Sequence, residues 1–364
     1  MQFKKKTLVR SVIMAAGGAS LLLGQSAVFA HGESIRGGGS GAINAVGAGI
    51  VEDVVVSLRW DARRYELFSD QEMVNFRLQG EDVHQHSKED AYFIQIGIPV
   101  TEDIDLAIMT QYNNFKGFKD NGDGQATICF FDANNDGMVD QTETVVVRPS
   151  TQCISETDES PGWGDTLIMG RYRFYNDGRH QWAGVLGLLM PTGKFTNKTD
   201  PNPYTGEAEI LGTHNQPGSG AFTVQTGIAY SGHLTDKVAM DADWILRVSG
   251  PGANNFRSGN SWQADVAFSY NHHAMFTPVV ELNGIFFKKD NEDGEPKKNS
   301  GGDVVYLSPG INVKFTDSIV AYGNFSYPVY QNLGGISNDE KYRWSFGISY
   351  ALGNGKAGPA HGHD

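Results

Sequence analysis

The sequence has 364 residues, of which 20% are charged and 40% hydrophobic, and its formal net charge is −13. So acidic a chain lacks the basic surface that nucleic acids select, which excludes nucleic acid as a partner. Beyond the N-terminal region no run of eighteen apolar residues occurs, so no transmembrane helix is expected there. The 40 aromatic residues and 45 glycines instead suit many strands and tight turns.

Residues 1–30 have the three parts of a secretory signal peptide. Four Lys and Arg residues lie between positions 4 and 10, residues 12–29 are apolar and small, and Val28-Phe29-Ala30 offers a cleavage site. A membrane anchor is the alternative, but glycines interrupt an apolar run that is already short for a bilayer core of about 30 Å. Cleavage after Ala30 leaves 25 Lys and Arg against 42 Asp and Glu, a formal charge of −17.

Residues 31–52 form the next segment, in which residues 37–49 are rich in Gly and Ala. This composition makes neither a stable helix nor a good strand, so we expect a flexible segment. It either hangs in the periplasm as a linker or folds into the mouth of the following domain as a plug. The sequence leaves both open.

Residues 53–353 contain twelve segments with the period-two alternation or the composition of β-strands. Each is long enough for a tilted strand to cross a bilayer. No convincing helical stripe lies between them. The segments are 53–67, 90–101, 104–117, 163–177, 180–195, 220–235, 238–252, 261–275, 276–290, 303–317, 319–333 and 342–353.

The connections between these segments alternate strictly in length. Every even connection is a tight turn such as Thr101-Glu102-Asp103, whereas the odd ones are longer, up to residues 118–162. Outer-membrane barrels have this pattern because short turns face the periplasm and longer loops face outside. The sequence therefore predicts an all-β protein, a transmembrane antiparallel up-and-down β-barrel of about 12 strands. We place it in the lipid bilayer of the outer membrane of a Gram-negative bacterium.

The polar face of the alternating strands is expected to line the lumen. In residues 262–270, for example, Trp262 and Phe268 share one face, and Gln263 and Asp265 share the other. Such a lumen either transports solutes or is a salt-bridged interior that conducts nothing. The expected lumen-lining residues are Arg171, Arg173, Asp241, Asp243, Arg247, Asp265, Glu281, Asn283, Asn312 and Lys314.

Residues 132–143, in the extracellular insertion 118–162, match the calcium-binding loop of EF-hands, with Gly137 at the sharp turn. Oxygen ligands recur at the spacing that wraps a hard cation, so we expect a structural Ca²⁺ ion. The alternative is a solvated acidic loop. The expected ligands are Asp132, Asn134, Asp136, Met138 through its carbonyl, Asp140 and Glu143.

The two cysteines, Cys129 and Cys153, flank this loop. In an exported protein an even pair usually forms a disulfide, which would here pin the insertion at its base. Two free thiols are the alternative.

Histidines mark both ends of the expected mature chain. His31 would become the N-terminus, and the tail 354–364 carries His361 and His363. These ends either capture a transition metal or are plain polar tails. His84 and His86 in the first long loop are expected to be surface residues.

Several short stretches, in this order and spacing, resemble the outer-membrane transporter family named after the phenol meta-cleavage pathway, which is distantly similar to FadL-type barrels. The resemblance covers most of the mature chain and implies transport of hydrophobic or aromatic compounds, with no particular substrate. The calcium-type insertion and the histidine-bearing tail depart from the family pattern. The stretches are Gly38-Gly39-Ser40-Gly41, Leu58-Arg59-Trp60, Trp163-Gly164-Asp165-Thr166-Leu167, Arg171-Tyr172-Arg173-Phe174, Met190-Pro191-Thr192-Gly193-Lys194 and Gln216-Pro217-Gly218-Ser219-Gly220.

No motif of a serine hydrolase, a nucleotide-binding loop or a zinc protease occurs, so we do not expect an enzyme. The predicted function is an outer-membrane channel or transporter for uptake of small compounds, hydrophobic or aromatic ones among them. The alternative is a closed barrel that serves as a surface-exposed structural or binding protein with a calcium-stabilised loop. The oligomeric state stays open.

Overall fold

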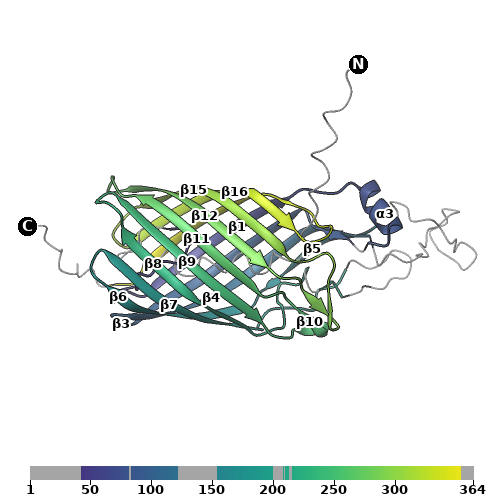
Figure 1. Ribbon diagram of the computed structural model, residues 1–364, viewed down its shortest axis with the longest axis horizontal. Coiled ribbons are helices and arrows are strands. Elements are labelled where there is room, and N and C mark those ends of the chain that lie inside the picture. Colours follow the sequence, from purple (N-terminus) through teal and green to yellow (C-terminus); the bar gives the residue numbers. More distant parts are fainter. Residues whose placement is uncertain are drawn as a thin grey trace, which may run out of the picture.

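The computed structural model describes residues 42–81, 83–121, 154–199, 208, 210–212 and 215–353. Its dominant feature is a tilted antiparallel sheet that closes on itself, since β1 pairs with β17 along its whole length (Figure 1). The strands are β1 (Val55–Tyr65), β3 (Lys88–Thr101), β4 (Ile104–Asp120), β5 (Ser155–Trp163), β6 (Thr166–Asn176), β7 (His180–Met190), β8 (Thr223–His233), β9 (Val238–Ser249), β11 (Ser261–Tyr270), β12 (Phe276–Phe287), β15 (Gly302–Lys314), β16 (Ile319–Leu333) and β17 (Glu340–Ala351).

β5 and β6 together occupy one strand position of the barrel wall, and each such position is here called a stave. The first half of β4 pairs with β6 and its second half pairs with β5. Counted this way, the described residues form a closed barrel of twelve antiparallel staves, each joined to its sequence neighbour. The predicted fold is confirmed, and every stave overlaps one of the twelve predicted segments.

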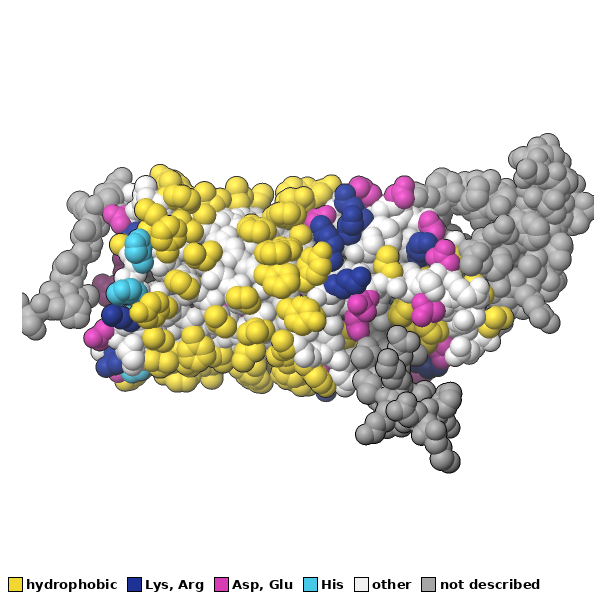
Figure 2. Space-filling model, turned by 90° about the horizontal axis from the view of Figure 1, so that it is seen from above, with side chains coloured by type: hydrophobic (Ala, Val, Ile, Leu, Met, Phe, Trp, Pro, Cys, Tyr) yellow, Lys and Arg dark blue, Asp and Glu magenta, His cyan; other side chains and the backbone are white. Residues whose placement is uncertain are grey.

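An apolar belt covers the outer surface. Along each strand the buried residues alternate with exposed ones, and the exposed positions carry large hydrophobic side chains. Figure 2 shows this belt ending at Lys and Arg residues on one side and at histidines and charged residues on the other. Hydrocarbon can contact such a belt, and closure leaves no unpaired strand edge within it. The belt includes one such residue from each of the twelve strand positions: Leu58, Ile94, Ile108, Ile168, Leu186, Ile228, Trp244, Phe268, Leu282, Leu307, Tyr327 and Phe346.

The two ends of the barrel differ. At one end, here called the turn end, short connections join β3 to β4 and β8 to β9. At the other, the loop end, longer connections hold the helix α3 (Asp70–Leu78), the two-residue strand β2 (His84–Gln85) and a small sheet. That sheet consists of β10 (Phe256–Arg257), β13 (Asn291–Glu292) and β14 (Glu295–Pro296). By the rule for outer-membrane barrels, the turn end faces the periplasm.

Two local expectations were wrong. Residues 70–78 form a helix, although no helical stripe was expected outside the signal peptide. Its N-terminal capping box, in which Ser69 and Glu72 bond each other's backbone N–H, was a readable signal. Residues 155–163 form β5, although residues 155–162 were assigned to a loop. Within the described ranges, no helix is long and apolar enough to cross a membrane.

Candidate functional site

The inward face of the barrel has two chemically different walls. The first, here called the apolar wall, comes mainly from β3, β4, β6 and β7; the second, the polar wall, comes from β9 through β17 and from β1. Both are buried. The apolar wall comprises Ala91, Phe93, Ala107, Met109, Leu167, Met169, Ala183, Val185 and Leu189. The polar wall includes Asp241, Asp243, Arg247, Gln263, Asp265, Glu281, Asn283, Ser308, Asn312, Asn324, Ser345, Ser57, Arg59 and Asp61.

The structure brings most of the expected lumen-lining residues together inside the barrel. Eight of the ten are buried there, namely Arg171, Asp241, Asp243, Arg247, Asp265, Glu281, Asn283 and Asn312. The other two lie at the turn end and pair with nearby carboxylates. Arg173 contacts Asp103 at 2.9 Å, and Lys314 contacts Asp317 at 2.8 Å.

Sequence reasoning missed the apolar wall. Its strands are apolar on both faces, as in Leu167-Ile168-Met169, so they lack the clean alternation that marks a polar lumen. A nearly continuous apolar run within a strand was the available signal, because it indicates burial of both faces.

Residues 42–51, here called the luminal segment, lie inside this space. Seven of them are apolar side chains at most 3% exposed: Ala42, Ile43, Ala45, Val46, Ala48, Ile50 and Val51. The segment has no regular secondary structure and contacts walls on opposite sides of the barrel. Side chains around a water-filled pore would be exposed, but Asp105 and Asp241 are each 0% exposed. The lumen is therefore closed at this level.

Carboxylates of the polar wall hold the backbone of the luminal segment. Glu281 accepts hydrogen bonds from the backbone N–H groups of Ile43 and Asn44, the latter at 3.0 Å to Oε2. Asp243 accepts one from Val46 N–H at 2.6 Å. An ionised carboxylate accepts a stronger hydrogen bond than a neutral oxygen does. Backbone amides, which any sequence offers, thus take the place of cationic partners.

Two ion pairs anchor the same segment from other strands. Arg171 and Asp105 are fully buried partners at 2.7 Å; Arg171 also donates to the Gly47 carbonyl at 2.7 Å, and Asp105 accepts from Val51 N–H at 3.0 Å. On β1, Arg59 pairs with Asp61 and donates to the Asn44 side chain at 2.9 Å.

Apolar contacts complete the seat of the luminal segment. Val46 and Ala48 belong to the cluster of the apolar wall, whereas Ile43 packs with Tyr322 of the polar wall. Gly310 lies against Ile43, whose Cδ1 is 2.6 Å from where a Cβ of residue 310 would stand. A cavity of about 460 Å³ adjoins the end of the segment at the turn end, between Val51, Glu102 and Arg173.

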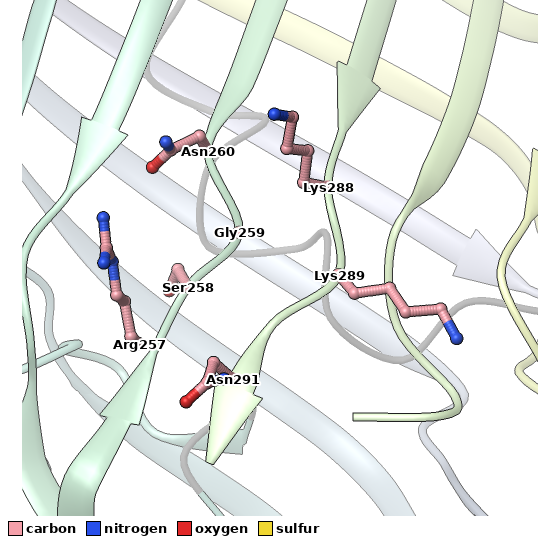
Figure 3. A pocket seen from close by; sticks show the side chains of 7 residues that line it. All are labelled: Arg257, Ser258, Gly259, Asn260, Lys288, Lys289 and Asn291. Atoms are coloured by element: carbon pink, nitrogen blue, oxygen red, sulfur yellow. The ribbon is translucent and has the colours of Figure 1, made fainter. Parts of the chain in front are cut away.

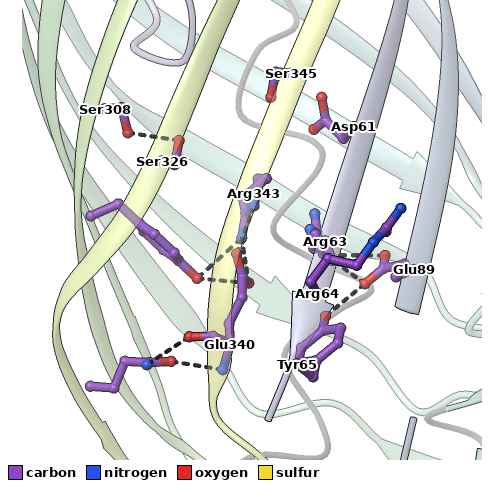
Figure 4. A network of polar contacts seen from close by, with 12 residues as sticks. Asp61, Arg63, Arg64, Tyr65, Glu89, Ser308, Ser326, Glu340, Arg343 and Ser345 are labelled. Atoms are coloured by element: carbon purple, nitrogen blue, oxygen red, sulfur yellow. Dashed lines mark hydrogen bonds and ion pairs between the residues drawn. The ribbon is translucent and has the colours of Figure 1, made fainter. Parts of the chain in front are cut away.

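A second polar network lies at the loop end of the lumen (Figure 4). Arg63 donates to both carboxylate oxygens of Glu89, at 3.0 and 2.9 Å, and the Tyr65 hydroxyl donates to the same carboxylate. On the adjacent strand Arg343 pairs with Glu340 at 2.9 Å. Arg63 and Arg343 are register partners across β1 and β17, so each arginine needs its own buried carboxylate.

The loop just beyond this network contradicts an expectation. His86, predicted to be a surface residue, is only 2% exposed and packs edge-on against Tyr65 with ring centroids 4.3 Å apart. Burial lowers the pKa of His86 to about 3. His84 beside it is partly buried.

Three of the stretches that carry the family resemblance meet in the barrel wall. The Asp165 carboxylate, at the break between β5 and β6, accepts hydrogen bonds from the backbone N–H groups of Gly193 and Ser219, both at 2.9 Å. A Cβ on Gly193 would lie 2.7 Å from the Cα of Gly218, so the chains approach too closely for a side chain. This junction closes the wall where β4 changes partner.

The remaining expected sites lie outside the described residues. These are the calcium ligands between Asp132 and Glu143, the cysteines Cys129 and Cys153, and the histidines of the two chain ends.

One comparison with a solved structure agrees with this architecture. An outer membrane channel from Pseudomonas putida F1 has the same fold, with a TM-score of 0.52. The two sequences are 11% identical, and the alignment covers 82% of this chain and 96% of that chain. The NanC porin aligns at 9% identity over 82% and 100% of the two chains (TM-score 0.43), and the CymD monoaromatic hydrocarbon channel at 8% over 83% and 89% (TM-score 0.41). No curated protein matches this chain.

The closed antiparallel barrel with its apolar belt is an outer-membrane barrel of a Gram-negative bacterium. A family model described as "Putative MetA-pathway of phenol degradation" matches residues 100–333, the greater part of the chain. This chain therefore belongs to that family.

Proposed function

We propose that the barrel is an uptake channel for small compounds with an apolar or aromatic part, and that the luminal segment holds it closed. One observation carries the proposal: the lumen has an apolar wall facing a polar wall. A solute with an aromatic ring and a polar group can place each part against a matching surface. The family description, which names phenol degradation, supports the same substrate class.

The luminal segment is suited to a reversible closure. It has no helix or strand of its own, and its seat consists of side chains on the wall. Displacing it breaks hydrogen bonds worth about 1.5–3 kcal/mol each where the acceptor is charged. It leaves the barrel wall intact, because the strand ladder does not include these residues.

The proposal is tested by liposome swelling with three proteins. The first has an intact luminal segment, and the second lacks residues 42–50. The third carries Ala48→Cys and Ser231→Cys as a disulfide staple between two neighbouring positions, which are joined by a 2.8 Å hydrogen bond from Ala48 N–H to Ser231 Oγ. We expect fast flux after deletion and none when stapled, with flux restored by a reductant. The native cysteines are replaced by serine in all three, so that the staple is the sole disulfide.

The solutes are L-phenylalanine and L-glutamine, two zwitterions of similar size. The apolar wall predicts faster entry of phenylalanine. Equal rates would remove the aromatic preference from the proposal, and no flux through a correctly folded deletion variant would remove the channel itself.

The rival function is a closed barrel that presents its loops to a partner. The packed lumen favours it, since the charged wall residues are buried and bonded to one another or to the luminal segment. The same deletion separates the two functions. A structural barrel would lose stability without gaining flux, because its interior would repack or stay narrow.

A further inference from the structure

A small group of cations lies at the loop end of β11 and β12. Arg257, Lys288 and Lys289 line a cavity of about 330 Å³, together with polar residues and backbone (Figure 3). The residues that line it include no carboxylate; the others are Ser258, Gly259, Asn260 and Asn291. The cavity therefore offers positive charge and hydrogen-bond donors with no built-in counter-charge.

The nearest acid in the sequence is turned away from this cavity. Asp290 is 6% exposed, and its carboxylate accepts a hydrogen bond from Gly259 N–H at 2.7 Å. Its backbone N–H donates to the Ser300 hydroxyl at 2.9 Å. Asp290 thus fixes the two chain segments beside the cavity.

The cavity lies directly beyond the apolar belt. On the outer face, the rings of Trp262 and Phe286 stack with centroids 5.6 Å apart. Asn260 lies two residues before Trp262 and Lys288 two residues after Phe286, just beyond the ends of β11 and β12, and Lys288 N–H donates to the Asn260 carbonyl at 2.9 Å. Aromatic rings of outer-membrane barrels lie at the membrane interface, so the cavity is at the level of lipid headgroups.

The directions of the three cationic side chains fit a cavity at the level of the lipid headgroups. In Figure 3 Arg257 and Lys288 extend back toward the barrel strands, whereas Lys289 extends the opposite way. Lys289 also donates to the Lys298 carbonyl at 3.2 Å. Arg257 and Lys288 therefore face the membrane side, and Lys289 faces the loops.

Two other cations at the loop end are neutralised within the chain. Arg64 pairs with Asp90 at 3.4 Å and Lys116 pairs with Glu159 at 2.8 Å. Within the described part of the chain, neither Arg257 nor Lys288 takes part in an ion pair. An anion from outside the chain would supply the missing charge.

We propose that this cavity binds a phosphate group on the headgroup of an outer-leaflet glycolipid, with Arg257 and Lys288 as the cationic contacts and Asn260 as a donor. Arginine and lysine are the usual phosphate partners, and the aromatic pair below contacts the start of the acyl region. The proposal rests on the membrane location and not on the channel function.

Native mass spectrometry of the intact barrel in detergent tests it, with bisphosphorylated and dephosphorylated lipid A as probes. The test variant is Arg257→Gln with Lys288→Gln, and Lys289→Gln is the matched control. Each cation near an anionic lipid contributes about fivefold, so the double variant should bind the phosphorylated probe about 30-fold more weakly. The control should bind as the wild type does. A heat-dependent mobility shift on gels establishes that each variant is folded.

Two results would overturn the proposal. One is wild-type affinity of the double variant for the phosphorylated lipid. The other is full displacement of the lipid by millimolar inorganic phosphate, which would make this a site for free phosphate. Loss of binding on dephosphorylation of the probe supports it.

Discussion

Removing the luminal segment should make the barrel a cation-selective channel. Outside the loop-end network, the described inward-facing charges are six carboxylates and three arginines. Arg59 and Arg171 are paired with Asp61 and Asp105. The excess negative charge therefore lies on β9, β11 and β12, where backbone N–H groups of the segment now contact it. Deleting residues 42–50 exposes this charge to permeating ions.

The size of the effect follows from Coulomb's law. An ion about 6 Å from a unit charge in water gains or loses about 0.7 kcal/mol, so three excess charges give about 2 kcal/mol of attraction for K⁺ and the same repulsion for Cl⁻. Without screening, K⁺ and Cl⁻ would thus differ by about 4 kcal/mol in interaction energy. Screening at 0.1 M salt reduces this difference to about 2 kcal/mol. A permeability ratio of K⁺ to Cl⁻ of about 30 is expected.

The assay is the reversal potential in planar bilayers with a KCl gradient. Asp243→Asn with Glu281→Gln, introduced into the deletion variant, removes two of the three excess charges and should lower the ratio to about 3. Asp103→Asn is the control, because Asp103 lies in an exposed turn and pairs with Arg173 outside this wall. An anion-selective deletion variant would refute the reasoning, as would a ratio unaffected by the double substitution.

Three further outcomes are expected. Burial lowers the pKa of His86 to about 3, from an ordinary value of about 6.5, so the loop end should be fully stable above pH 6.5. Between pH 7 and pH 4.5 it should lose about 2.5 kcal/mol of local stability. Hydrogen exchange should detect this loss, and His86→Phe should abolish it. Gly193→Ala should destabilise the barrel by about 1–3 kcal/mol in urea titrations, whereas Gly184→Ala, with open space at its Cβ, should not. Titration calorimetry should show that Glu143→Gln weakens calcium binding, if the loop 132–143 binds it; no heat from the wild type would exclude calcium.

The strands were predictable because lipid imposes a strict pattern on them. Hydrocarbon requires an apolar side chain at every second position, so β9 alternates along its whole length and β17 alternates from Tyr342 onward. The short turns between the alternating segments then mark where one strand ends and the next begins, which gives the number of strands. The helix α3 follows a different rule, since its nine residues bury only Met73, Val74 and Arg77, too few to make a stripe. Its capping box was the stronger signal.

The position of the luminal segment was not predictable from its own residues. Its Gly and Ala content suits a free linker as well as a packed strand-like segment, since small side chains let backbone N–H groups approach wall carboxylates closely. The deciding information lies far away in the chain, in the acids of β9 and β12, about 200 to 240 residues from their backbone donors. Buried carboxylates need partners, and too few arginines face the lumen to supply them. A surplus of inward acids over inward bases in a predicted barrel therefore indicates that some other donor, a chain segment or a solute, fills the lumen; in this chain that donor is the backbone of residues 42–51.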